Sequence, residues 1–131
     1  MNRSVAAVII TMGTRPVEFA RALDSLRGQQ GVDLDIVVVG NAWQPTGLPA
    51  GVKGHYSPVN LGIPGGRTAG TDLVTGDYLF YLDDDAWLPT TDVISRMLDI
   101  LQTRPEVGIV QPRATDPDTG VTPSRCVPRL I

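Results

Sequence analysis

The chain contains the run Tyr78-Leu79-Phe80-Tyr81-Leu82-Asp83-Asp84-Asp85, in which five apolar or aromatic residues lead directly into three aspartates. Five such residues in a row predict a strand that is buried on both faces, as in a parallel sheet covered by helices. Ligands of open α/β sheets bind beyond the carboxyl ends of the strands, which is where these aspartates fall. Adjacent like charges repel one another unless a cation or a solvated loop relieves them. The run therefore predicts either an acidic surface turn or a hard-cation site, and its place after a buried strand favours the cation site.

Two more apolar runs predict strands in the first third of the chain. Residues 5–11 form a continuous apolar run rich in β-branched side chains, and residues 34–39, apolar except for Asp35, predict a second buried strand. Between them, Pro16 suits the first position of a helix, and apolar residues at helical spacing continue that helix to Gly28. A strand, helix and strand of these lengths predict two parallel neighbouring strands.

The rest of the chain continues the alternation of strands and helices. Together with the first elements, this order predicts an α/β fold with a mostly parallel sheet flanked by helices. The further elements are a loop over 42–54, an edge strand over 55–56, a glycine-rich turn over 60–67 opening a helix that stops near residue 75, a helix between residues 89 and 105, and a short strand over 107–110.

The chain length of 131 residues predicts one domain over 1–131. We expect an α/β core over about residues 1–112 and an extended tail over 113–131. Within the tail, Asp116-Pro117-Asp118-Thr119-Gly120 has the composition of a turn, so its two aspartates are not expected to form a second acidic site.

Composition excludes several classes of protein. A net charge of −3, with scattered arginines and a single lysine, disfavours a nucleic-acid partner. Cys126 is the only cysteine, so an internal disulfide and a cysteine zinc site are excluded. No apolar run reaches membrane-spanning length and the N-terminus does not resemble a signal peptide. We expect a cytoplasmic protein, with attachment to the inner membrane surface through other segments left open.

Polar residues at the other strand ends are candidates for the same site. The first strand ends in Thr11-Met12-Gly13-Thr14 and the second in Gly40-Asn41, so both ends should lie on the edge that carries the aspartates. They predict either a nucleotide pocket or plain turns.

The glycine-rich turn offers two further interpretations. Gly62, Gly65 and Gly66 would expose backbone N–H groups to an anion, although a plain turn is the simpler reading. Arg67 either reaches a phosphate or pairs with a surface acid such as Asp72.

Three other side chains are expected to be structural. His55, the only histidine, and the two tryptophans, Trp43 and Trp87, are interpreted as packing residues, the tryptophans at the rim of the pocket.

The aspartate run suits a particular class of metal. Mg2+ and Mn2+ take oxygen ligands from one or two carboxylates, with water and substrate phosphates completing the shell. If the strand continues through the run, Asp83 and Asp85 point to one side and Asp84 to the other. Asp83 and Asp85, the predicted metal ligands, can therefore share one cation, or divide a cation and a ribose hydroxyl between them.

The motifs together resemble family 2 glycosyltransferases. The resemblance rests on Val8-Ile9-Ile10-Thr11, Arg15-Pro16, Ile36-Val37-Val38-Val39-Gly40-Asn41, Asn60-Leu61-Gly62, Gly65-Gly66-Arg67-Thr68-Ala69-Gly70, and Thr75-Gly76-Asp77 followed by the aspartate run. These motifs occur in the family's order, with plausible spacing, to about Val110.

The resemblance implies a GT-A fold, here incomplete, that binds a UDP-, GDP- or dTDP-linked sugar with Mn2+ or Mg2+ and transfers the sugar, with inversion, to an acceptor. The aspartates would form its DxD motif, with Asp85 as the direct metal ligand. Asp83 would face the ribose or a metal-bound water, and Asp84 the sugar or nucleotide. The remaining implied nucleotide-sugar contacts are Thr11, Gly13, Thr14, Arg15, Gly40, Asn41, Asn60, Gly66 and Arg67.

Two departures from the family pattern leave alternatives open. The family's second strand commonly ends in an aspartate that contacts the base, where this chain has Gly40 followed by Asn41. The acidic general base of an inverting enzyme is not visible in these 131 residues. The alternative is therefore a non-catalytic nucleotide-sugar-binding module of the same fold. An aspartyl phosphatase is disfavoured because its Asp-x-Asp nucleophile lies on the first strand with a Thr or Val shortly after it, whereas these aspartates follow a late strand and precede Ala86-Trp87. A receiver domain is disfavoured because the acids that it needs after the first strand are replaced by Thr11-Met12-Gly13.

Overall fold

The computed structural model of the chain describes residues 2–124. The chain divides into two compact units, Met1–Ser95 and Arg96–Ile131. The first unit contains the sheet and two helices, and helix α3 (Val93–Thr103) begins in it and ends in the second. The expectation of one domain with a core ending near residue 112 stays a prediction.

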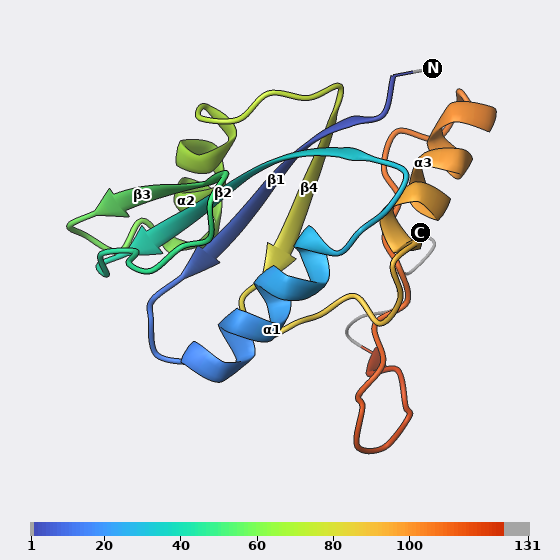
Figure 1. The fold of residues 1–131 in the computed structure, drawn as a ribbon. Helices are drawn as coiled ribbons and strands as arrows, with labels where there is room; N and C mark the ends of the chain where they lie inside the picture. The colour runs from blue at the N-terminus through green and yellow to red at the C-terminus, as the bar shows by residue number, and fades with distance from the viewer. Residues whose placement is uncertain (1, 125–131) are drawn as a thin grey trace. The chain divides into compact units, whose positions relative to one another are not determined.

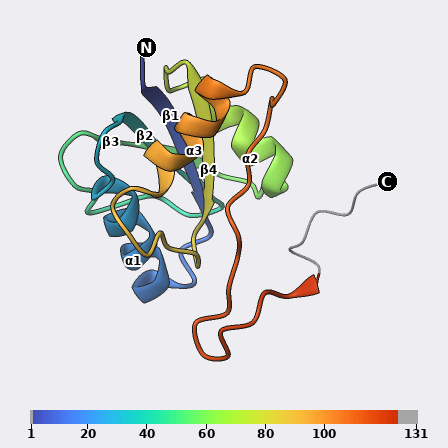
Figure 2. The same ribbon diagram turned by 90° about the vertical axis from the view of Figure 1, so that its right-hand side faces the viewer.

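The first unit is built on a parallel sheet of four strands. Every neighbouring pair is parallel, in the order β3-β2-β1-β4 (Figure 1). Two helices cover opposite faces of this sheet (Figures 1 and 2). The predicted α/β class with a mostly parallel sheet is thus confirmed. The elements are β1 (Ser4–Thr11), α1 (Pro16–Arg27), β2 (Asp33–Asn41), β3 (Val52–Ser57), α2 (Gly62–Thr71) and β4 (Tyr78–Asp83).

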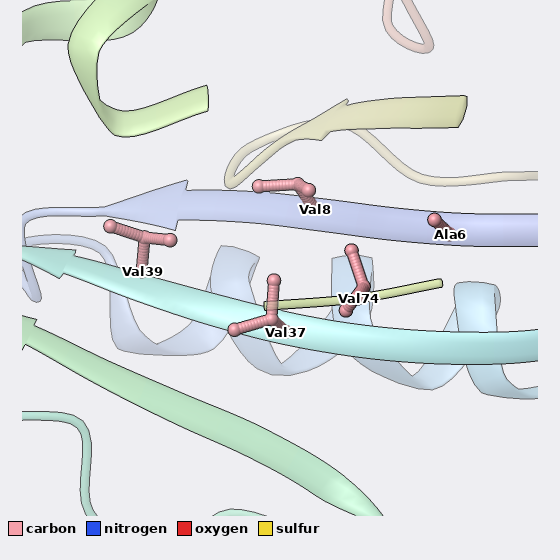
Figure 3. Packing of buried hydrophobic residues seen from close by; sticks show 5 residues of the cluster. All are labelled: Ala6, Val8, Val37, Val39 and Val74. Atoms are coloured by element: carbon pink, nitrogen blue, oxygen red, sulfur yellow. The ribbon is translucent and has the colours of Figure 1, made fainter. Parts of the chain in front are cut away.

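The centre of the sheet is aliphatic on both faces. Strands β1 and β2 carry runs of buried side chains because each is flanked by strands and covered by helices. On one face, the buried cluster consists of Ala6, Val8, Val37, Val39 and Val74 (Figure 3). Small and β-branched side chains fill this layer without polar atoms that would need partners.

Helix α1 forms as its sequence predicts. Pro16 occupies the first turn, where a missing N–H costs no hydrogen bond, and Gly28 caps the end. Of the apolar residues at helical spacing, Leu23 and Leu26 are buried, whereas Phe19 is half-buried.

Helix α2 approaches the sheet unusually closely because two of its buried residues are glycines. A Cβ added to Gly70 would lie 2.5 Å from Cγ1 of Val8, and one added to Gly66 would lie 3.0 Å from Cδ1 of Ile10. These glycines therefore serve packing between helix and sheet. The helix ends at Thr71, earlier than the predicted stop near residue 75, so Leu73 lies outside it and is exposed.

The strand register aligns the carboxyl ends of the strands. Thr11 pairs with Gly40, and Ile10 with Asp83, so the ends of β1, β2 and β4 meet at one edge of the sheet. This edge is called the carboxyl edge below, and the opposite one, where the strands begin, the amino edge.

A hydrogen-bonded carboxylate joins two strands near the amino edge. Lys53 Nζ lies 3.0 Å from Asp35 Oδ2, and the backbone N–H of Thr75 donates to the same oxygen over 2.9 Å. Burial raises the pKa of Asp35, but the hydrogen bonds from Thr75 and Lys53 and the Lys53 charge outweigh it, so the pKa lies below its ordinary value. Asp35 thus ties β2 to β3 and to the segment before β4.

Strand β4 differs from its prediction. It lies at an edge of the sheet, and Leu79 and Tyr81 are 53% and 36% exposed, whereas Phe80 and Leu82 are buried. The prediction of burial on both faces was therefore wrong. A run of apolar residues cannot distinguish a central strand from an edge strand, because position in the sheet depends on distant neighbours.

Two other boundaries also changed. Strand β3 begins at Val52, inside the predicted loop, and is longer than the expected pair His55-Tyr56. Residues 107–110 are irregular, and Ile109 is 89% exposed, so the strand predicted there is wrong. An extended apolar segment becomes a strand only where a neighbour supplies hydrogen bonds, and the four-stranded sheet of the described residues does not include it.

The second unit contains the predicted turn. The backbone N–H groups of Asp118 and Gly120 bond to the side chain and the carbonyl of Asp116, and Gly120 has a φ of 69°. These aspartates therefore build a turn, as their composition indicates. Within residues 2–124, every helix is too short or too polar to serve as a membrane span.

Candidate functional site

A cavity of about 370 Å³ opens at the carboxyl edge of the sheet. It receives residues from the ends of β1, β2 and β4 and from the start of α2. Eight of the predicted site residues line it. The full lining is Ile10, Thr11, Met12, Thr14, Arg15, Asn41, Asn60, Gly62, Ile63, Asp83, Asp84 and Asp85.

Asp84 is the buried member of the aspartate run. Its Oδ2 accepts a hydrogen bond from the hydroxyl of Thr11 over 2.9 Å, and that hydroxyl accepts one from the N–H of Gly13 over 3.1 Å. The side chain of Asp84 is only 11% exposed. Since a buried carboxylate needs donors, Thr11 fixes Asp84 and joins the end of β4 to the end of β1.

Asp85 faces an arginine from the other side of the cavity. Arg15 Nη1 donates to Asp85 Oδ2 over 2.5 Å, and Arg15 Nη2 lies 3.8 Å from Asp84 Oδ1. Both Arg15 and Asp85 remain about half exposed, at 52% and 46%. One guanidinium therefore bridges two carboxylates at the mouth of the cavity.

Asp83 has a different arginine partner. Arg67 Nη2 lies 3.6 Å from Asp83 Oδ1, and the guanidinium carbon lies 4.9 Å from the centre of the Tyr81 ring. The sequence suggested that Arg67 reaches a phosphate or pairs with a surface acid such as Asp72; the acid that it contacts is Asp83. Asp83 is the most exposed of the three aspartates, at 68%.

Two arginines and one hydroxyl thus offset the mutual repulsion of the three aspartates. Strand β4 ends at Asp83, and Ala86 N bonds back to Asp83 O over 3.2 Å, so the chain turns at once. The condition under which Asp83 and Asp85 would point to one side, a continuing strand, is therefore not met. Within residues 2–124, no three His, Cys, Asp or Glu side chains converge as a metal-binding group.

Asn41 secures the opposite wall of the cavity. It is 3% exposed; its Nδ2 donates to Gly62 O over 3.1 Å and its Oδ1 accepts from Leu61 N over 3.3 Å. Both ends of this amide thus hold the start of α2 in place. Asn60 next to it accepts from Gly62 N over 2.9 Å, and its Nδ2 faces the sulfur of Met12 at 3.7 Å.

Three predicted glycines lie behind the lining. Gly66 packs α2 on the sheet, as described above. A Cβ at Gly40 would lie 1.9 Å from Trp43 O, and one at Gly13, whose φ is 73°, would meet the Trp43 indole at 2.4 Å. The loop after β2 crosses directly over Gly40, which explains why a larger residue does not occupy this strand position.

The turn after the aspartates is held by a polar residue of α1 and by another just after its C-terminal cap. The hydroxyl of Ser25 accepts from Leu88 N over 3.0 Å. The buried amide of Gln29 accepts from Ile94 N over 3.0 Å and donates to Thr90 O over 2.6 Å. These bonds anchor residues 88–94 on the end of α1, so they also limit where the aspartate run can lie. Neither residue carried a sequence signal that singled it out.

Two apolar lining residues were not predicted, and three aromatic or basic ones lie elsewhere. The two unpredicted residues are Ile10 and Ile63, which together with Met12 from the end of the first strand give the cavity its apolar part; Ile63 is 60% exposed. Trp43 packs edge-on against Phe19, with ring centres 6.4 Å apart. Trp87 lies under Arg21, 3.7 Å from its guanidinium carbon. Neither tryptophan lines the cavity, nor does His55 on β3.

Solved structures share this architecture. The mannosyltransferase PcManGT from Pyrobaculum calidifontis, in complex with GDP-Man and Mn2+, superposes with a TM-score of 0.66 at 19% identity, over 77% of this chain and 33% of its own. Residues 1–349 of S. aureus TarS superpose with a TM-score of 0.63 at 17% identity, over 79% and 33%. The complex of the same TarS fragment with UDP-GlcNAc gives 0.64 at 15% identity, over 79% and 32%. The predicted GT-A fold is therefore confirmed, and the chain spans about a third of the length of these structures.

A comparison of sequences is more specific than the fold. No curated protein matches the chain. The family model described as glycosyl transferase family 2 matches residues 7–126, which confirms the predicted resemblance. Since that match covers most of its length, the chain belongs to glycosyl transferase family 2.

Proposed function

We propose that this chain is the donor-binding part of an inverting glycosyltransferase, which takes a nucleotide-diphosphate sugar with a divalent cation and transfers the sugar to an acceptor. The observation that carries the proposal is the aspartate run at the end of β4, which lines the cavity together with polar residues from the ends of β1 and β2. Similar folds hold UDP-GlcNAc in TarS and GDP-Man with Mn2+ in PcManGT, which supports a UDP-, GDP- or dTDP-linked donor.

The donor atoms fit Mg2+ or Mn2+. Asp83 and Asp85 are exposed carboxylates in the cavity, and such cations take one or two carboxylates and complete their shell with water and phosphate oxygens. When bound, the cation would neutralise the diphosphate and stabilise the departing phosphate as a Lewis acid.

The chain's own residues would divide the donor between them. Thr14 and Arg15 would lie along the nucleoside and diphosphate, and Asn60 would offer its Nδ2 group to the nucleotide. Asp84, fixed by Thr11, would hold the turn that presents Asp83 and Asp85. Gly13, Gly40, Asn41 and Gly66 would act by shaping the walls, and Arg67 by holding Asp83.

A non-catalytic module of the same fold is the second candidate. One observation favours it: within the described residues, each carboxylate that lines the cavity already has an arginine or threonine partner, so no unpaired general base faces the cavity. Turnover of a donor sugar by the isolated chain would exclude this candidate, whereas binding without turnover would favour it.

Thermal unfolding tests the proposal on the full chain. UDP, GDP and dTDP are added separately with Mn2+, and the matching nucleotide should raise the unfolding temperature. At a hundred times its Kd, the nucleotide should increase the free energy of unfolding by about 2.7 kcal/mol. The Asp85→Asn variant should lose this response. Asp72→Asn, which removes an exposed carboxylate outside the cavity, is the matched control and should keep it. No response to any of the three nucleotides would refute the proposal.

A further inference from the structure

The two arginines that neutralise the aspartates differ in their position relative to the cavity. Arg15 lines the cavity and contacts Asp85 and Asp84, whereas Arg67 lies outside the lining and contacts Asp83. Each is a guanidinium paired with a carboxylate of the same turn, so chemistry alone does not separate them. Their supports do.

Arg67 is held by its own helix and by strand β4. Its guanidinium lies over the Tyr81 ring at 4.9 Å. The Thr71 hydroxyl, 2.8 Å from Arg67 O, donates its single proton there, so the Tyr81 hydroxyl, also 2.8 Å from Thr71 Oγ1, donates to Thr71. This chain of contacts fixes the ring on which Arg67 rests and so keeps its guanidinium beside Asp83.

Arg15 is anchored through its backbone and held at its tip by the carboxylates. Its carbonyl accepts the first hydrogen bond of α1, from Phe19 N over 2.9 Å, which places the residue at the helix start. Its side chain is 52% exposed and reaches Asp85 across the cavity mouth. A long, half-exposed side chain of this kind can exchange one oxygen partner for another without moving the backbone.

We propose that Arg15 is an exchangeable counter-cation, which neutralises Asp85 in the metal-free protein, releases it when a divalent cation binds, and then pairs with the diphosphate of the donor. Arg67 is the fixed counterpart and stays on Asp83. The assignment rests on the proposed function, and it refines that function by giving Asp85, which the family resemblance makes the direct metal ligand, a resident counter-cation in Arg15. Guanidinium groups pair readily with phosphate oxygens, so a released Arg15 has a partner in the same cavity.

The first test measures Mn2+ affinity without nucleotide, by calorimetry and by electron paramagnetic resonance of free Mn2+. Arg15→Gln should bind Mn2+ about tenfold more tightly than the wild type, because its competitor for Asp85 is gone. Arg67→Gln should change the affinity by less than about threefold, because Arg67 pairs with Asp83 and does not compete with the cation for Asp85. Arg21→Gln removes an equal charge outside the cavity and is the control, and Asp85→Asn should lose the site.

The second test measures nucleotide-diphosphate affinity at saturating Mn2+. Arg15→Gln should bind the nucleotide about tenfold more weakly, having lost a charge-assisted bond to the diphosphate. The two effects of Arg15→Gln have opposite signs, whereas a residue that merely supports the fold would lower both affinities.

Each outcome decides part of the assignment. Unchanged or weaker Mn2+ binding by Arg15→Gln overturns the exchange, as does the absence of Mn2+ binding in every variant. If Arg15→Gln binds Mn2+ more tightly but no variant binds a nucleotide, the counter-cation role is supported and the proposed donor function falls. An Arg67→Gln effect as large as that of Arg15→Gln overturns the distinction between the two arginines.

Discussion

The two edges of the sheet use carboxylates in opposite ways. At the amino edge, Asp35 receives Lys53 and the Thr75 N–H on one oxygen, and these donors keep its pKa below the ordinary value. At the carboxyl edge, three consecutive aspartates share Arg15, Arg67 and Thr11; Asp83 is largely exposed and Asp85 about half exposed.

The difference separates a structural carboxylate from carboxylates that can receive a ligand. Asp35 joins strands that are already neighbours, and its partners come from the strand beside it and the loop before β4. Asp83 and Asp85 instead line a cavity. Arg67 on α2 neutralises Asp83, and Arg15, just before α1, neutralises Asp85. In a parallel sheet the loops and helix starts gather at the carboxyl edge, so that edge can assemble charges that no single element could hold.

The largest effect is expected at the carboxyl edge, from Thr11→Val. This change removes the hydroxyl that donates to buried Asp84 and accepts from Gly13. Leaving a buried charged acceptor without its donor should lower the free energy of unfolding by about 2 kcal/mol, measured by urea denaturation. The nucleotide response should fall as well, because the aspartate turn loses its anchor.

A matched threonine serves as the control for that change. The hydroxyl of Thr68 bonds only within α2, to Pro64 O over 3.0 Å, on an exposed face. Thr68→Val should therefore alter stability by no more than about 0.5 kcal/mol. A Thr11→Val protein as stable as Thr68→Val would contradict the anchoring role of Thr11.

A smaller effect is expected at the amino edge, from Asp35→Asn. The amide still accepts from Thr75 but loses the charge paired with Lys53, so the free energy of unfolding should fall by about 1 kcal/mol. The nucleotide response should be unchanged, since Asp35 does not line the cavity. A weakened nucleotide response in Asp35→Asn would break the separation between the two edges.

The smallest effect is the pH dependence of the stabilisation that Asp35 contributes to the folded state. Because the folded pKa of Asp35 lies below its ordinary value, the carboxylate stabilises the fold fully above the unfolded pKa and loses this contribution as pH falls through the folded pKa. Urea denaturation at about pH 6 and about pH 3 should show the gap between wild type and Asp35→Asn narrowing in acid. A gap that widens in acid would show that the pKa is raised instead.

Local patterns predicted most of the first unit. Apolar runs gave β1 and β2 nearly to the residue, Pro16 gave the start of α1, and the aspartate run gave the end of β4. Parallel pairing followed from the spacing of those elements. Since the carboxyl ends of parallel strands meet, eight of the predicted site residues were found around one cavity.

The errors fall where a residue's role depends on neighbours that are distant in sequence. Residues 107–110 look like a strand but lie outside the sheet, and β4 looks central but lies at its edge. Gly66 belongs to a stretch whose composition fits either a phosphate loop or a plain turn, and its packing against Ile10 could not be read from the sequence. Apolar runs and glycines each fit several environments, and only packing selects one.

The sequence by itself determined the class of this chain, its family and the acidic end of β4, because periodicity and motif order are properties of the chain alone. The tertiary structure decided which charges meet. Arg15 and Asp85 are 70 residues apart, and Thr11 and Asp84 are 73 apart. Such pairs form only when the register of the sheet and the start of α1 bring them to one edge, since Coulomb and hydrogen-bond energies depend on distance in space.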